Sequence, residues 1–265
     1  MILIFIHTGV STEKQADGSG NWLQKGVYVD YAFQSGGVHL YNGTIIEFNN
    51  TTSIYRWECI AQNESTAELS ISLNGTLSDG IIVLIKNDVF IDISSRSVYL
   101  ENGTLIGTTH LWLPANPLPN ELITLLDVPP NKVEMTIINR EEYAQTCQGI
   151  QKTFTVSGMA TGLKNIGASG NMSYLIMCDF DTGVMVDWGV HMGDNEGTLK
   201  ALGVMGLMVQ GIFSLISTNI DLGPSYHLPV NSSANSAILL ILPFPIIFCA
   251  IFLAIYISKK KSRKK

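Results

Sequence analysis

Charge is scarce in this sequence, in which only 14% of the 265 residues are charged, against about 25% in an average soluble domain. Six of the 16 basic residues fall in positions 259–265, so 10 basic residues face 22 acidic ones in the rest of the chain. Nothing in so acidic a body offsets phosphate charge, and we therefore expect no nucleic-acid partner.

Short motifs that mark common enzyme classes are also absent. The sequence has no HExxH, GxSxG, Walker or GxGxxG pattern. His191 and Asp194 could form a catalytic pair, but no nearby nucleophile accompanies them. Asp179, Asp181, Asp187 and Asp194 surround one predicted hairpin without the spacing of a calcium-binding loop. We therefore predict no catalytic residues, no metal and no cofactor.

Cysteine is sparse, with four residues in the chain. No CxxC or Cys/His spacing indicates a metal site. Cys249 stands in a long apolar run and is expected to be a small apolar residue there. Among the other three we expect a disulfide between Cys147 and Cys178, which an external compartment permits, and a buried free thiol at Cys59.

One long uncharged run is present near the C-terminus. Ser236–Ile257 has 22 residues, which as a helix would span about 33 Å and match a bilayer core. The basic residues after it predict a cytoplasmic tail at 258–265, because positive charge favours the inner side. We predict a single-pass cell-membrane protein, with one C-terminal transmembrane α-helix between Ser236 and Ile257 and the N-terminal domain outside.

The remaining boundaries follow from composition. Residues 1–20 begin with the apolar Met1–Ile6 and are interpreted as a signal-peptide remnant or a disordered N-terminus, with a first β-strand as the alternative. Residues 21–221 form the predicted extracellular β-rich domain. Residues 222–235 are rich in proline and serine and are predicted to be a linker stalk.

Alternating polarity indicates β-structure in the predicted ectodomain. Thr66–Leu73 places every second residue, all apolar, on one face, and Asn74-Gly75 after it predicts a turn. Asp181-Thr182-Gly183 predicts a hairpin. Turn signals about ten residues apart favour an antiparallel sheet, as a sandwich or a half-barrel. Further strands are expected at Val27–Phe33, Ile54–Ile60, Ile81–Ile85, Val89–Tyr99, Thr104–Leu113, Val133–Ile138, Thr153–Val156, Met172–Phe180 and Val184–Met192.

Ala201–Ile220 leaves two interpretations open. It is apolar enough to suggest a second membrane helix, which would put the N-terminal body in the cytoplasm. Its glycines weaken a helix, and its polar residues break the run before it reaches about 20 apolar residues. We expect one or two strands that close the sheet.

Acceptor sites for N-glycosylation are frequent. Asn-x-Ser/Thr occurs eight times, always on the predicted outer side. Asn231 is a poor candidate because it lies close to the predicted membrane, and Asn49 and Asn50 overlap. We predict a glycoprotein modified at sites among Asn42, Asn49, Asn50, Asn63, Asn74, Asn102 and Asn171.

Five segments are spread over most of the predicted ectodomain: Trp22–Phe33, Tyr55–Ser72, Ser97–Pro114, Cys178–Trp188 and Phe213–Ile220. Together they resemble segments of a group of uncharacterised archaeal membrane-anchored surface proteins. That resemblance implies a signal peptide, a β-rich outer domain and a C-terminal membrane helix, with no activity to carry over. The Asp179–Gly183 hairpin also resembles one in lipoprotein-carrier half-barrels.

Three functions are compatible with these features. The first is a non-enzymatic, membrane-anchored surface protein whose ectodomain is structural or binds partners such as envelope proteins, beside the lipid bilayer itself. The second is a carrier of lipid or another hydrophobic ligand on the concave face of a curved sheet, with methionines such as Met159, Met185 and Met205 in an adaptable pocket. The third is an envelope hydrolase that uses His191.

Overall fold

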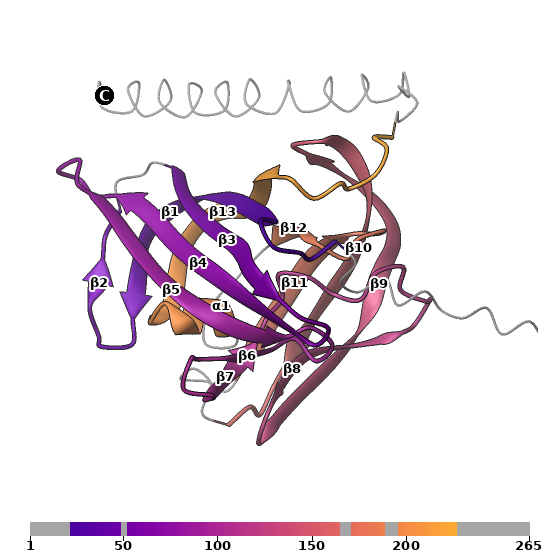
Figure 1. Cartoon of the computed structure of the whole chain (residues 1–265), viewed down its shortest axis with the longest axis horizontal. Helices are drawn as coiled ribbons and strands as arrows, with labels where there is room; N and C mark the ends of the chain where they lie inside the picture. The colour runs from indigo at the N-terminus through magenta and orange to yellow at the C-terminus, as the bar shows by residue number, and fades with distance from the viewer. Residues whose placement is uncertain (1–21, 49–51, 165–170, 189–195, 227–265) are drawn as a thin grey trace, which may run out of the picture. The chain divides into compact units, whose positions relative to one another are not determined.

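The structure is a computed structural model, and it describes residues 22–48, 52–164, 171–188 and 196–226. These residues form one antiparallel sheet of 13 strands and one short helix (Figure 1). The elements are β1 (Tyr28–Leu40), β2 (Ile45–Ile46), β3 (Thr52–Gln62), β4 (Thr66–Thr76), β5 (Ile82–Asp92), β6 (Ser97–Tyr99), β7 (Leu105–Thr108), β8 (Leu122–Val128), β9 (Asn131–Thr146), β10 (Gly149–Ala160), β11 (Met172–Asp179), β12 (Met185–Trp188), α1 (Gly197–Ala201) and β13 (Val204–Thr218).

The sheet curls until its two ends nearly meet. Its strand order is β7-β6-β5-β4-β3-β1-β13-β12-β11-β10-β9-β8, and β2 pairs only with β1. At the open seam between β7 and β8, the Asp127 backbone N–H donates to the Thr108 hydroxyl at 3.1 Å. The predicted mainly antiparallel β fold is confirmed, and of the two arrangements left open the structure has the half-barrel.

Strict alternation on the central strands fills the inside of this curved sheet. On β4, Ala67, Leu69, Ile71 and Leu73 are all fully buried, as the sequence predicts. β3 buries its own alternate residues on the same side, since it pairs with β4 residue by residue. Apolar side chains that point inward from successive strands therefore form one continuous core.

The predicted strand interpretation of Ala201–Ile220 is confirmed. β13 lies between β1 and β12 and joins the two halves of the sheet. The preceding α1 begins at Gly197, where Glu196 caps it by accepting from the Thr198 backbone N–H. Neither α1 nor β8 was expected from the sequence.

The structure corrects one predicted turn and one predicted interruption between strands. β4 runs straight through Asn74-Gly75, and the chain reverses later, around Leu77–Gly80. Gly75 is needed in the strand because a Cβ there would lie 2.7 Å from the Phe48 ring. β5 is likewise continuous through Asn87-Asp88, where two separate strands were expected.

The domain extends past its predicted end at 221. Leu222 is buried, and the Tyr226 backbone N–H donates to the Ile150 carbonyl at 2.8 Å. In the part of the chain that the structure describes, no helix has the length and apolar character needed to cross a membrane. The predicted anchor Ser236–Ile257, its basic tail, the rest of the stalk and residues 1–20 lie outside the described residues.

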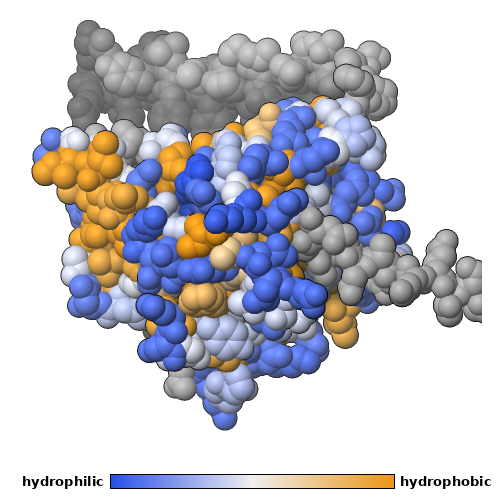
Figure 2. Space-filling view, in the orientation of Figure 1, coloured by the Kyte–Doolittle hydropathy of each residue, from blue (hydrophilic) through white to orange (hydrophobic). Residues whose placement is uncertain are grey.

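The outer surface seen in Figure 2 is largely hydrophilic, with an apolar area at the upper left. That area coincides with the far end of the β4–β5 hairpin in Figure 1. Ile81, Ile82 and Leu84 at this end are among the most exposed large apolar side chains of the domain.

Candidate functional site: an acidic pocket on the outer face

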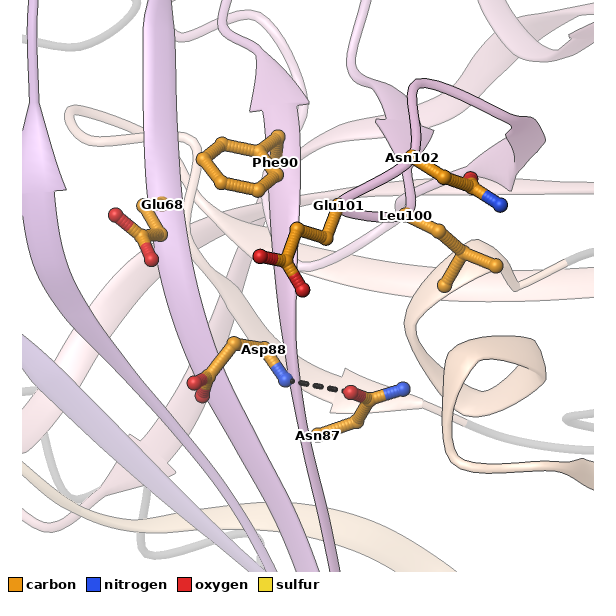
Figure 3. A pocket seen from close by; sticks show the side chains of 7 residues that line it. All are labelled: Glu68, Asn87, Asp88, Phe90, Leu100, Glu101 and Asn102. Carbon is orange, nitrogen blue, oxygen red and sulfur yellow. Dashed lines mark hydrogen bonds between the residues drawn. The ribbon is translucent and has the colours of Figure 1, made fainter.

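A hollow of about 590 Å³ lies on the outer face of β4 and β5, beneath the turn that joins β6 to β7. Strand register places Glu68 directly opposite Phe90, and Asp88 comes two residues earlier on the same face of β5. The Leu100–Gly103 turn adds Glu101 from above (Figure 3). Its lining residues are Glu68, Asn87, Asp88, Phe90, Leu100, Glu101 and Asn102.

Three carboxylates therefore face one hollow. Figure 3 shows Glu101 reaching back over β5, so that its carboxylate lies on the same side of the strand as those of Glu68 and Asp88. Among the described residues, no Lys, Arg or His side chain lies within ion-pair distance of these three carboxylates. The pocket presents uncompensated negative charge around one aromatic ring.

Hydrogen bonds of two asparagines hold the rim of this pocket in place, one in the β6–β7 turn and one in β5. The Asn102 carboxamide oxygen accepts from the Thr104 backbone N–H at 3.0 Å, which fixes the β6–β7 turn. The Asn87 side chain donates to the Ala201 carbonyl at 2.7 Å, and its oxygen accepts from the Asp88 backbone N–H at 2.9 Å. The side chains of Asn87 and Asn102 are therefore held by hydrogen bonds to the backbone.

A second polar cluster lies inside the sheet, without exposure to solvent. Tyr55 donates to the Thr198 hydroxyl at 2.7 Å, and that hydroxyl donates to Glu196 Oε1 at 2.7 Å. Glu196 Oε2 accepts from the His110 backbone N–H at 2.7 Å and lies 3.2 Å from His110 Nδ1. Since a carbonyl only accepts, His110 Nε2 must carry the proton that it shares with the Leu125 carbonyl at 2.6 Å.

The electrostatics of this cluster favour an ionised Glu196. Burial alone would raise its pKa, but the hydrogen bonds and charge of His110 and the Thr198 hydroxyl outweigh burial, and the pKa is lowered. Both Glu196 and His110 are fully buried. The cluster ties β3, α1 and the β7–β8 seam together, and no substrate could reach it from solvent without opening the sheet.

Arg96 reinforces the same seam. Its guanidinium donates to the carbonyls of Thr109 and Trp112, at 3.1 and 3.3 Å, and to that of Thr124 on β8. Burial lowers the pKa of Arg96 to about 10, partly offset by the charges of Cys178 and Glu196. The seam is held by side chains because the strands there do not complete a ladder.

The predicted glycosylation sites differ in setting. Asn42, Asn63, Asn102 and Asn171 are exposed. Asn74 is half-buried in β4, and its oxygen accepts from the Ile54 backbone N–H at 3.2 Å. Asn49 and Asn50 lie outside the described residues. Glycan attachment at any of these sites stays a prediction.

The cysteines are not joined as expected. Cys147 is exposed in the β9–β10 turn, whereas Cys178 is fully buried on β11, and both thiols are free. The structure therefore lacks the predicted Cys147–Cys178 disulfide. Cys59 is buried and free, as the sequence analysis expected. Burial raises the pKa of Cys178 despite the opposing charge of Arg96.

The described part of the structure does not bring together the residues that the sequence analysis considered for catalysis or metal binding. His191 and Asp194 lie outside the described residues. The hairpin predicted at Asp181-Thr182-Gly183 is confirmed, with the Gly183 N–H donating to the Asp179 carbonyl at 2.9 Å. Among the described residues, no group of three or more His, Cys, Asp or Glu side chains is arranged to hold a metal ion.

No family model, curated protein or solved structure matches this chain. The resemblance to archaeal surface proteins and to lipoprotein carriers therefore stays a prediction. The acidic pocket was missed by sequence reasoning because its residues come from β4, β5 and a later turn. Only one indication of the pocket is present in the sequence: the alternation of Thr66–Leu73 places Glu68 on the polar, outer face of its strand.

Proposed function

We propose that this chain is a non-enzymatic cell-surface protein, anchored by Ser236–Ile257, whose β-domain binds a partner at the acidic pocket. The observation that carries the proposal is the set of three carboxylates around Phe90, which have no Lys, Arg or His of the described residues within ion-pair distance. The surface location rests on the sequence, through the uncharged run, the basic tail and the acceptor asparagines.

The chemistry of the pocket favours a cationic group on the partner. A lysine ammonium or arginine guanidinium could pair with Glu68, Asp88 and Glu101 while packing on the Phe90 ring, which attracts cations through its π face. Because the carboxylates are partly or fully exposed, each pair should contribute only about 0.2–1 kcal/mol and should weaken with salt. Such a site suits reversible recognition of a basic segment.

A binding titration with a defined cationic probe tests this proposal. The full chain, reconstituted in lipid nanodiscs so that the basic tail is on the opposite side, is titrated with a fluorescent tetralysine peptide. Three lost pairs correspond to about 0.6–3 kcal/mol, so the triple variant Glu68→Gln, Asp88→Asn, Glu101→Gln should bind about 3- to 160-fold more weakly.

The control is Glu47→Gln, which removes one exposed carboxylate outside the pocket. It should bind the peptide as the wild type does, and raising the salt from 50 to about 500 mM should weaken both. Equal affinity of the triple variant and the wild type would refute the pocket as the binding site. Digestion of the domain by protease added to intact cells would separately support its external position.

A further inference from the structure

The far end of the β4–β5 hairpin exposes a cluster of large apolar side chains, here named the apolar tip and consisting of Ile81, Ile82 and Leu84. Their exposed fractions are 58%, 72% and 62%. Figure 2 shows a broad apolar area at the upper left, where Figure 1 has the far end of this hairpin. Scattered exposed apolar residues are ordinary, but a contiguous group at a protruding end indicates a surface that is covered in use.

The apolar tip differs from the rest of its own strand. Ile82 and Leu84 stand opposite Thr76 and Asn74, on the outer face of the sheet. Further along the same face, that strand carries Lys86 and Asp88, as a solvated face should. The change from apolar to charged occurs within one strand, so the apolar end is a local feature rather than a general property of the outer face.

The length of chain after the domain limits how far the domain can lie from the predicted anchor. The described domain ends at Tyr226 and the predicted anchor begins at Ser236. The nine residues between them reach at most about 35 Å when fully extended. A domain of about 200 residues is itself roughly 40 Å across, so the tether holds it within about one diameter of the bilayer.

Figure 1 shows the far end of the β4–β5 hairpin and the segment after β13 along the upper margin of the β-domain, on opposite sides of the view. We infer that the apolar tip lies in the outer interface of the lipid bilayer to which the chain is anchored, an inference that rests on the proposed function. Ile82 and Leu84 then contact acyl chains, while Lys86 is placed to meet lipid phosphates. Asn74 lies opposite Leu84, so the same contact requires Asn74 to carry no glycan.

Photocrosslinking to lipid tests the inference with the full chain. The protein is reconstituted in phosphatidylcholine vesicles that contain a phospholipid with a diazirine near the start of its acyl chain, irradiated and digested, and the modified peptides are identified by mass spectrometry. Lipid adducts are expected on the peptide that contains the apolar tip and on the anchor. Met159, which is 67% exposed on β10, is the internal control and should carry at least ten-fold fewer adducts.

The double variant Ile82→Ser, Leu84→Ser should lose at least nine-tenths of the adducts on the tip peptide and keep those on the anchor. Adducts on the anchor but none on the wild-type tip would overturn the inference and leave the proposed function standing. Adducts on neither would overturn both. Protein–protein crosslinks between tips of two copies, in place of lipid adducts, would show that a second copy covers the tip and would also overturn the inference.

Discussion

Replacement of Glu196 by glutamine is the sharpest test of how the seam is held. Four groups approach its two carboxylate oxygens: the His110 N–H and imidazole at one oxygen, and the Thr198 hydroxyl and N–H at the other. Glutamine has the same shape but only one oxygen. Whichever way its amide turns, an NH₂ group faces a donor, and one buried donor loses its acceptor.

The size of the expected loss of stability follows from the burial of these groups. The donor that loses its acceptor is buried, and such a loss costs about 1–3 kcal/mol. We expect Glu196→Gln to lower the free energy of unfolding by about 1–3 kcal/mol at pH 7, which for a domain of this size lowers Tm by about 2–12 °C. The measurement is thermal unfolding of the full chain in detergent, followed by far-UV circular dichroism.

Acid should remove the difference in stability between the wild type and Glu196→Gln. Because the pKa of Glu196 is lowered in the folded state, its stabilising contribution is complete above the ordinary glutamate pKa of about 4.3 and is lost as the pH falls through the folded value. The gap between wild type and Glu196→Gln should therefore shrink below about pH 4. The exposed control Glu47→Gln should stay within about 0.5 kcal/mol of the wild type throughout. A Glu196→Gln protein as stable as that control at pH 7 would refute the network as a structural link.

Three further outcomes are expected. Gly183→Ala should destabilise the domain by about 2 kcal/mol or more in urea unfolding, because Gly183 has φ +74° and a Cβ would collide with the carbonyl that faces it, whereas Gly80→Ala, with φ +86° and open space, should cost only about 1 kcal/mol. In the native protein, Ellman's reagent should modify Cys147 quickly and Cys178 only after unfolding, and equal rates would contradict their described exposure. Glycopeptide mapping of protein from its native membrane should find Asn74 unmodified, since its side chain is half-buried and hydrogen-bonded.

The sequence predicts the strands well because alternation is a local signal. It fails at Asn74-Gly75, where a turn dipeptide lies inside a strand because Phe48 packs on the glycine. A hairpin closed there would have placed Glu68 opposite Ile81, whereas the true register places it opposite Phe90. Because the predicted register was wrong, sequence reasoning could not bring Glu68 and Phe90 together, and it missed the acidic pocket.

The buried hydrogen-bond network around Glu196 could not be predicted from the sequence for a different reason. His110 and Glu196 are 86 positions apart, and neither lies in a motif with characteristic spacing. Only the closure of the whole sheet brings the β7–β8 seam next to α1. Contacts of this kind depend on tertiary topology, which residue periodicity does not encode.

The interior of the sheet also bears on the hydrophobic-carrier alternative. Ring centroids are 5.2 Å apart for Tyr31 and Phe213 and 4.9 Å apart for Phe33 and Phe213, and all three side chains are buried. The methionines expected to line a pocket differ in setting, since Met185 is fully buried whereas Met159 is 67% and Met205 40% exposed. Aromatic side chains fill this part of the concave face, and the carrier alternative stays a prediction.

On the outer face, one hairpin carries both candidate surfaces. Ile82 and Phe90 stand on the same face of β5, eight residues apart, which at about 3.3 Å per residue corresponds to about 26 Å. If the apolar tip lies in the bilayer, a hairpin standing upright would hold the acidic pocket about 26 Å above it, and a tilted hairpin would bring the pocket closer. The pocket would then face basic segments of proteins that project a similar distance from the same membrane, and its acidity would keep it from adhering to anionic lipid headgroups beneath it.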